Sequence, residues 1–345
     1  MPGMAARPAH VLVADDSASN RELLFDILKP LGYKVSCVAD GEEALEMLRH
    51  QPVDLALLDV MMPRRTGISV CRHVKADPAL CLIPIVLVTG LTNVEDRIKG
   101  IECGADDFLN KPVHKEELLA RVRSLLKLKL FTDELENAET VLFSLALSIE
   151  GKDPYTGGHC ARLSKYSVSL AGRVGLSQQE RVALRRAGIV HDIGKVAVPE
   201  QILLKPGPLT PDERKTMEQH PIIGERICTP LRSFREVLPI IRHHHEKMDG
   251  SGYPDGLKSQ QIPITARVMT IVDIYDSLTT DRPYRQALST EEAFRIMREE
   301  TQRGWWDAEL LRAFEALILG EVRSAASDNR NEEAVRVQIS QADGS

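Results

Sequence analysis

The sequence LALLDVMMPRRTG, residues 55–67, decides the fold of the first part of the chain. Four apolar residues lead into Asp59, and a short apolar run before turn-forming residues is typical of a buried central strand in a parallel sheet. Comparable runs (HVLVA, KVSCVA, IVLVTG and DFLNKP) alternate with helix-like segments between residues 10 and 125. This alternation predicts an α/β, doubly wound parallel sheet.

Polar residues stand where the predicted strands end. They are Asp15, Asp16, Asp59, Thr89 and Lys111. Each alone would more often be a solvated strand end or a helix cap, but the carboxyl ends of parallel strands share one crevice, where ligand chemistry collects. Three carboxylates there would repel one another without a divalent cation, and oxygen ligands favour Mg²⁺. With Lys111 as a further positive charge and Thr89 as a hydrogen-bond donor, the set predicts a phosphoacceptor site.

The second part of the chain has a different pattern. After Gly151 the strand signals nearly vanish, which predicts an all-α domain. Six of the ten histidines lie in this part: His159, His191, His220, His243, His244 and His245. The adjacent pair His191–Asp192 can place an imidazole on one metal and a carboxylate between two metals. Asp273 lies in an apolar helical stretch, where an unpaired carboxylate is costly and a cation would stabilise it.

A long helical pattern with few breakers joins the two parts, from about residue 115 to 150. Its apolar residues recur in steps of three and four: Leu128, Phe131, Leu135, Ala138, Leu142, Leu145 and Ile149. About three heptads is the lower limit for a coiled coil. Two interpretations therefore stay open, a helix that joins two protomers in a homodimer and a helix packed on the second domain.

The composition excludes several classes of protein. The chain has 345 residues, 43% hydrophobic and 27% charged, which is typical of a soluble protein with two domains. A net charge of -6 offers no global attraction for DNA, and no recognition-helix pattern or basic stripe follows residue 130. The six scattered cysteines and the lack of an apolar run of about 18 residues predict a reduced cytoplasmic protein that does not span a membrane.

The first domain resembles the receiver domain of two-component response regulators. The resemblance covers residues 8–126 and is carried by DD (15–16), LLDVMMPRRTG (57–67), TG (89–90) and KP (111–112). It implies that a sensor histidine kinase phosphorylates Asp59, with Asp15 as outer support. It also implies a Mg²⁺ ion held by Asp16, Asp59 and the Met61 carbonyl. Phe108 stands at the place of a switching aromatic residue, although a core phenylalanine is an equally good interpretation.

The second domain resembles the HD-GYP subgroup of the HD metal-dependent phosphohydrolases. The motifs lie between residues 145 and 320: His191-Asp192 with Lys195, HHE (244–246), DGSGYP (249–254) and DIYDSLTTDRPYR (273–285). The resemblance implies one metal held by His159, His191, Asp192 and Asp273, and a second held by Asp192, His220, His244 and His245. His243 matches no ligand position. Mixed histidine and carboxylate ligation is compatible with Fe, Mn, Ni or Zn.

The same resemblance implies hydrolysis of cyclic di-GMP to pGpG or GMP. Two cations with Asp192 and Lys195 can activate water and offset phosphoryl charge, and Tyr253, Arg282 and Arg285 are the expected substrate-binding residues. Some members of the family carry a third metal on a glutamate that here is Tyr155. The expected site is therefore binuclear, although Glu150 and Asp153 lie near in sequence.

These expectations define four segments. They are a receiver domain (8–126), a helical linker (127–149), a metal-dependent phosphohydrolase domain (150–322) and a disordered tail (323–345). Phosphorylation of the first is expected to control hydrolysis by the third. Two other functions remain: a phosphodiesterase for a different cyclic dinucleotide, and a catalytically idle adaptor that only senses the nucleotide. A missing ligand residue would favour the adaptor, and none is missing.

Overall fold

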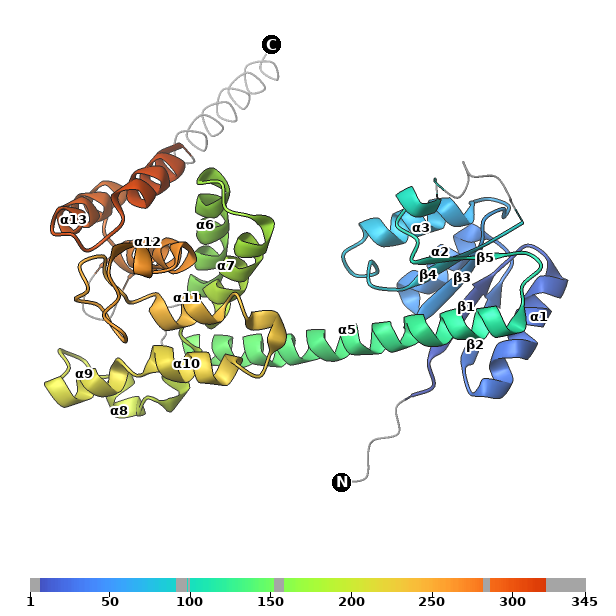
Figure 1. The fold of residues 1–345 in the computed structure, drawn as a ribbon, viewed down its shortest axis with the longest axis horizontal. Helices are drawn as coiled ribbons and strands as arrows, with labels where there is room; N and C mark the ends of the chain where they lie inside the picture. Colours follow the sequence, from blue (N-terminus) through green and yellow to red (C-terminus); the bar gives the residue numbers. More distant parts are fainter. Residues whose placement is uncertain (1–6, 91–97, 99, 152–157, 282–285, 321–345) are drawn as a thin grey trace, which may run out of the picture. The chain divides into compact units, whose positions relative to one another are not determined.

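The computed structural model describes residues 7–90, 98, 100–151, 158–281 and 286–320 (Figure 1). The chain divides into two compact units, Met1–Ala138 and Glu139–Ser345. This division falls inside a single helix, α5 (Lys115–Glu150). An α/β unit followed by a helical unit, joined by a long helix, confirms the predicted fold class.

The first unit is built on a five-stranded parallel sheet with the order β2-β1-β3-β4-β5. Its strands are β1 (His10–Ala14), β2 (Lys34–Val38), β3 (Leu55–Asp59), β4 (Ile85–Thr89) and β5 (Asp107–Asn110). The segment that begins with LALLD is the central strand β3, and all five of its residues are buried. A parallel sheet is covered on both faces, which explains this unbroken apolar run.

Helices cover the sheet and create two separate cores in the first unit. They are α1 (Ala18–Leu28), the 3-10 turn η1 (Lys29–Leu31), α2 (Gly41–His50) and α3 (Gly67–Ala76), together with the first part of α5. Alternate strand residues point to opposite faces. Val11 packs in the cluster that contains Leu118 of α5, whereas Leu12 packs in the cluster that contains Val70 of α3. The carboxyl ends of the strands are therefore held at one edge between two packed layers.

The second unit is helical in its described residues (Figure 1). Its labelled helices are α6 (His159–Arg173), α7 (Gln178–Val190), α8 (Glu200–Leu203), α9 (Pro211–Met217), α10 (His220–Cys228), α11 (Leu238–His243), α12 (Ile264–Thr279) and α13 (Thr290–Gln302), with 3-10 turns η2 (Ile193–Ala197), η3 (Arg232–Phe234) and η4 (Ser259–Gln261). Residues 308–320 are helical as well. One apolar cluster joins α6, α7, α11, α12 and α13. The short helices and turns leave this core to form the polar centre described below.

Helix α5 belongs to both cores. Leu118 and Val122 are buried in the first unit, and Leu142 and Ala146 are buried in the second. Between them Leu128, Phe131 and Leu135 are exposed. At Leu142 the structure agrees with the interpretation of a helix packed on the second domain, because this side chain is buried there.

Across the described ranges, none of the helices combines the length and the apolar composition that a bilayer span requires.

Candidate metal centre and phosphoacceptor site

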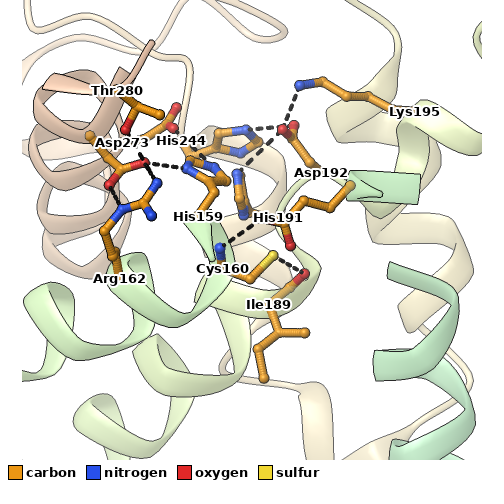
Figure 2. A network of polar contacts seen from close by, with 12 residues as sticks. His159, Cys160, Arg162, Ile189, His191, Asp192, Lys195, His244, Asp273 and Thr280 are labelled. Carbon is orange, nitrogen blue, oxygen red and sulfur yellow. Dashed lines mark hydrogen bonds and ion pairs between the residues drawn. The ribbon is translucent and has the colours of Figure 1, made fainter. Parts of the chain in front are cut away.

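Asp192 lies among the histidines of the second unit (Figure 2). Its Oδ1 is 3.1 Å from Nε2 of His220 and 3.8 Å from Nε2 of His244, and its Oδ2 is 3.4 Å from Nε2 of His191. Two atoms bound to one metal at about 2.0–2.2 Å lie about 3.0–3.5 Å apart at ordinary bond angles. Two of the three separations fall in that range, and the third slightly exceeds it.

Several of these atoms are buried without a hydrogen-bond partner in the described part of the chain. They are Nε2 of His191, His220 and His244, and Oδ1 of Asp192. A buried polar atom left without a partner costs about 1–3 kcal/mol, so a cluster of four would be strongly destabilising. A divalent cation would satisfy these atoms together, and neutral imidazole with carboxylate is a donor set that suits transition metals. The residues present therefore fit a metal centre.

The backbone fixes the orientation of two of these imidazoles. Nδ1–H of His220 donates to the Met217 carbonyl at 2.8 Å, and Nδ1–H of His244 donates to the Ile241 carbonyl at 2.8 Å. Because a carbonyl only accepts, the proton is on Nδ1 and the lone pair of Nε2 points toward Asp192. Burial also lowers the pKa of His244, which favours the neutral form that binds metals.

A second group lies beside the first. It consists of His159 from α6, His191 from the end of α7 and Asp273 from α12, and Nε2 of His159 is 3.6 Å from Oδ1 of Asp273. The first group consists of Asp192, His220, His244 and His245. The fold thus gathers all seven predicted ligand residues into two neighbouring groups that could each hold one cation.

Lys195 gives the site a positive charge of its own. It forms an ion pair with Asp192 from one turn later, in η2. Burial alone would raise the pKa of Asp192, but the charge of Lys195 and the contacts with His191 hold this pKa well below its usual value. Asp192 is therefore ionised, as a bridging ligand must be. A cavity of about 220 Å³ opens over these residues and is also lined by Ala146 and Ile149 of α5.

A glycine lets two ligand segments approach one another. A Cβ atom on Gly194 would lie 1.9 Å from the carbonyl oxygen of His220 and 2.6 Å from the nitrogen of Gly224. Only a residue without a side chain lets η2 pack this closely on α10. The glycine of the HDIGK sequence therefore places His220 beside Asp192.

The segment after HHE folds around a glutamate that the sequence analysis did not identify as functional. The buried Glu246 carboxylate accepts hydrogen bonds from the backbone nitrogens of Asp255, Gly256 and Leu257 at 2.7, 3.1 and 3.1 Å. The Tyr253 ring stacks on His245 with 4.8 Å between ring centroids. Glu246 thus holds the loop that places Tyr253 against a candidate ligand. In the sequence, the turn-forming residues that follow HHE were the feature that could have indicated this role of Glu246.

Some of the remaining residues that were considered in the second domain lie outside the described ranges, and the others lie beside the two ligand groups or apart from them. Arg282, Arg285, Tyr155 and Asp153 lie outside the described residues, as does the predicted tail. His243 lies apart from both groups, with Nδ1 3.5 Å from Oδ2 of Asp255. Oε1 of Glu150 accepts a hydrogen bond from the backbone nitrogen of Cys160 at 3.2 Å, and Glu150 also lines the cavity.

The predicted phosphoacceptor residues meet at the carboxyl edge of the sheet in the first unit. Nζ of Lys111 is 2.8 Å from Oδ2 of both Asp15 and Asp59. Asp15, Asp16 and Asp59 form a group in the first unit that could hold a cation, with Asp16 exposed. Burial raises the pKa of Asp59, and Lys111 opposes this shift.

Three more predicted residues lie at or near this edge. The backbone nitrogen of Met61 is 3.4 Å from Oδ1 of Asp59, and Thr89 ends β4 beside the end of β3. Phe108, in β5, is half-buried and packs against the core cluster that contains Val70. Its position in the core agrees with the structural interpretation and leaves the switching role as a prediction.

The fold and the two sites define a class of protein: an α/β domain with an acidic edge, followed by a helical domain with a histidine-rich centre. The receiver domain family of response regulators matches residues 11–123, and the HD domain family matches residues 145–310.

Two of the relatives are similar to most of the chain, and a third is similar to about half of it. A Vibrio cholerae protein named "Probable cyclic di-GMP phosphodiesterase" is 37% identical over 83% of this chain and 73% of its own. The Xanthomonas campestris "Cyclic di-GMP phosphodiesterase response regulator RpfG" is 34% identical over 86% of this chain and 84% of its own. A Vibrio cholerae "3'3'-cGAMP-specific phosphodiesterase 3" is 37% identical over 47% of this chain and 35% of its own. The chain belongs to the family of response regulators that join a receiver domain to an HD-GYP phosphodiesterase domain.

Proposed function

We propose that the second domain is a phosphodiesterase with a binuclear metal centre. The observation that carries the proposal is the set of buried atoms without hydrogen-bond partners: Nε2 of three histidines and Oδ1 of Asp192. One cation would be held by His159, His191, Asp192 and Asp273, and the other by Asp192, His220, His244 and His245. A pair of divalent cations supplies an activated water and stabilises phosphoryl charge. Fe, Mn, Ni and Zn all suit the donor set.

The chain's own residues prepare this site for a phosphodiester. Asp192 is ionised and can bridge two cations, and Lys195 lies beside it to offset the negative charge that develops on phosphoryl oxygens. Tyr253, stacked on His245, offers an aromatic ring at the edge of the site. Arg282 and Arg285 supply planar forks for phosphate or a guanine edge.

The proposed substrate is cyclic di-GMP. Three relatives that match most of the chain are named for this activity. Three relatives that are named for 3'3'-cGAMP match only about half of the chain. The alternative substrate is therefore the hybrid dinucleotide, which shares the phosphodiester chemistry and differs in one base.

The first domain is the proposed control element, with boundaries at 8–126 and a linker at 127–149. A sensor histidine kinase would phosphorylate Asp59, with Mg²⁺ held by Asp16, Asp59 and the Met61 carbonyl and with Lys111 and Thr89 binding the phosphoryl oxygens. Asp15 supports the site through Lys111, at 2.8 Å. The continuous helix α5 contributes to both cores and so offers a physical link between the sites.

Turnover and metal content measured on the same purified protein test this proposal. We expect about two transition-metal ions per chain and hydrolysis of cyclic di-GMP faster than that of 3'3'-cGAMP. A protein that binds two metals but prefers 3'3'-cGAMP would identify the alternative substrate. A protein that binds cyclic di-GMP without hydrolysis in the presence of each candidate metal would instead support the idle adaptor.

A further inference from the structure

A buried ion pair contacts the candidate ligand His159. Asp276, on α12, is 2% exposed. Its Oδ2 accepts a hydrogen bond of 2.7 Å from Nδ1–H of His159 and one of 3.0 Å from Nη2 of Arg162. Nε of Arg162 donates to Oδ1 of the same carboxylate. Asp276 therefore joins two side chains of α6 to α12.

The spacing of these residues creates two layers between α6 and α12. His159 and Arg162 are three residues apart on α6, and Asp273 and Asp276 are three residues apart on α12, so each pair shares one helix face. In the front layer, Nε2 of His159 is 3.6 Å from Oδ1 of Asp273, and the candidate metal position lies between these two atoms. In the rear layer Arg162 binds Asp276. Nothing in the expected ligand pattern requires this rear layer.

We infer that Asp276 and Arg162 are positioning residues of the metal centre, which hold His159 with its proton on Nδ1 and its Nε2 lone pair free for a cation. The inference rests on the proposed metal-dependent function. A carboxylate that accepts the distal N–H of a ligating histidine fixes the ring and increases its basicity. Arg162 supplies the positive charge without which a carboxylate this deeply buried would be unstable.

The arrangement makes the two metal positions unequal. His220 and His244 donate their Nδ1–H groups to neutral backbone carbonyls, whereas His159 donates to an ionised carboxylate. The guanidinium of Arg162 binds both oxygens of this buried carboxylate and stabilises its negative charge. Loss of this charge is therefore expected to weaken the metal at His159 and to leave the metal at His220 and His244 in place.

Titration of the full-length apoprotein with Mn²⁺ or Zn²⁺ alone, followed by elemental analysis, tests the inference without any nucleotide. In Asp276→Asn we expect one metal to bind as in the wild type and the other about 10–100-fold more weakly. Arg162→Lys keeps a cation near Asp276 and should bind the second metal more tightly than Arg162→Ala does.

A matched control comes from another arginine–carboxylate pair between helices. Glu139 of α5 accepts hydrogen bonds from Nη2 and Nε of Arg186 of α7 at 2.9 and 3.2 Å, and its side chain is 14% exposed. Neither residue belongs to the candidate ligand groups. Glu139→Gln should therefore lose a comparable ion pair and retain both metals at wild-type affinity.

The outcomes separate this inference from the proposed function. A wild-type protein that binds no transition metal would contradict the proposed function itself. Two metals in the wild type with unchanged affinities in Asp276→Asn would overturn the positioning role alone. Equal metal loss in Asp276→Asn and Glu139→Gln would show a general structural effect. If Asp276→Asn does not fold, equal affinities in Arg162→Lys and Arg162→Ala would also overturn the role.

Discussion

The acidic site of the first unit and the histidine site of the second differ in whether their buried polar atoms have partners within the protein. At the acidic site Lys111 lies 2.8 Å from both Asp15 and Asp59 and acts as an internal cation. At the histidine site buried Nε2 atoms face Asp192 without hydrogen bonds. A site with an internal cation tolerates an exchangeable ion such as Mg²⁺, whereas a site of unsatisfied ligand atoms depends on its metal for stability as well as for chemistry.

The largest expected effect comes from removing the carboxylate that the two metal groups share. In Asp192→Ala, both coordination spheres lose a ligand, so we expect loss of both metals. Turnover should fall by at least about 10³-fold, because a metal pair contributes several kcal/mol of charge stabilisation. His220→Ala should mainly lower the occupancy of one metal. Metal analysis and hydrolysis rates check this, and full metal content with a near-normal rate in Asp192→Ala would contradict a shared ligand.

At the acidic site, we expect replacement of the phosphoacceptor carboxylate to abolish phosphorylation without loss of the metals in the second unit. Asp59→Asn replaces a nucleophilic carboxylate with an amide, so labelling by acetyl phosphate should disappear. The metal content of the second unit should stay at the wild-type value. Mass spectrometry of the intact labelled protein measures this, and undiminished labelling would assign the phosphoryl group to a different residue.

A packing change tests whether close backbone approach creates the histidine site. Gly194→Ala places a Cβ 1.9 Å from the His220 carbonyl, and overpacking of this kind costs about 1–3 kcal/mol of unfolding free energy or more. Metal affinity should fall together with the unfolding free energy, because the added Cβ displaces His220. Gly90→Ala is the control, since among the described residues other than its chain neighbours no atom lies within 4 Å of its added Cβ. Denaturant unfolding measures both, and equal stabilities of the two variants would refute the argument from packing.

The smallest expected effect on stability lies in the exposed middle of α5. Leu135 is 41% exposed, so Leu135→Asp should change the unfolding free energy by about 0.5 kcal/mol or less. If this stretch joins two protomers, the variant should self-associate more weakly and lose the response of turnover to phosphorylation while it keeps its metals. Sedimentation with and without a phosphoryl analogue checks this, and a variant that remains dimeric and responsive would exclude the linker as the coupling element.

Local sequence patterns were sufficient to predict much of the fold. The apolar run before Asp59 predicted the central strand, because a strand covered on both faces must be apolar throughout. The lack of breakers predicted the helix from residue 115 to 150. The seven candidate ligands could be named because their sequence motifs resemble those of the HD-GYP subgroup, and the burial cost of an unpaired carboxylate supported Asp273 in particular. Each of these predictions depends on residues close together in sequence or on a single residue type.

What only the tertiary structure decided involves partners far apart in the chain. Asp276 and His159 are separated by 117 positions, and no periodicity shows that α12 places this carboxylate behind that imidazole. The heptad steps of α5 likewise do not show that Leu142 is buried in its own domain while Leu135 stays exposed. Sequence spacing determines which residues share a helix face, but the packing of other helices determines what that face meets. The candidate ligand residues could therefore be identified from the sequence, whereas the residues that hold them in place could not.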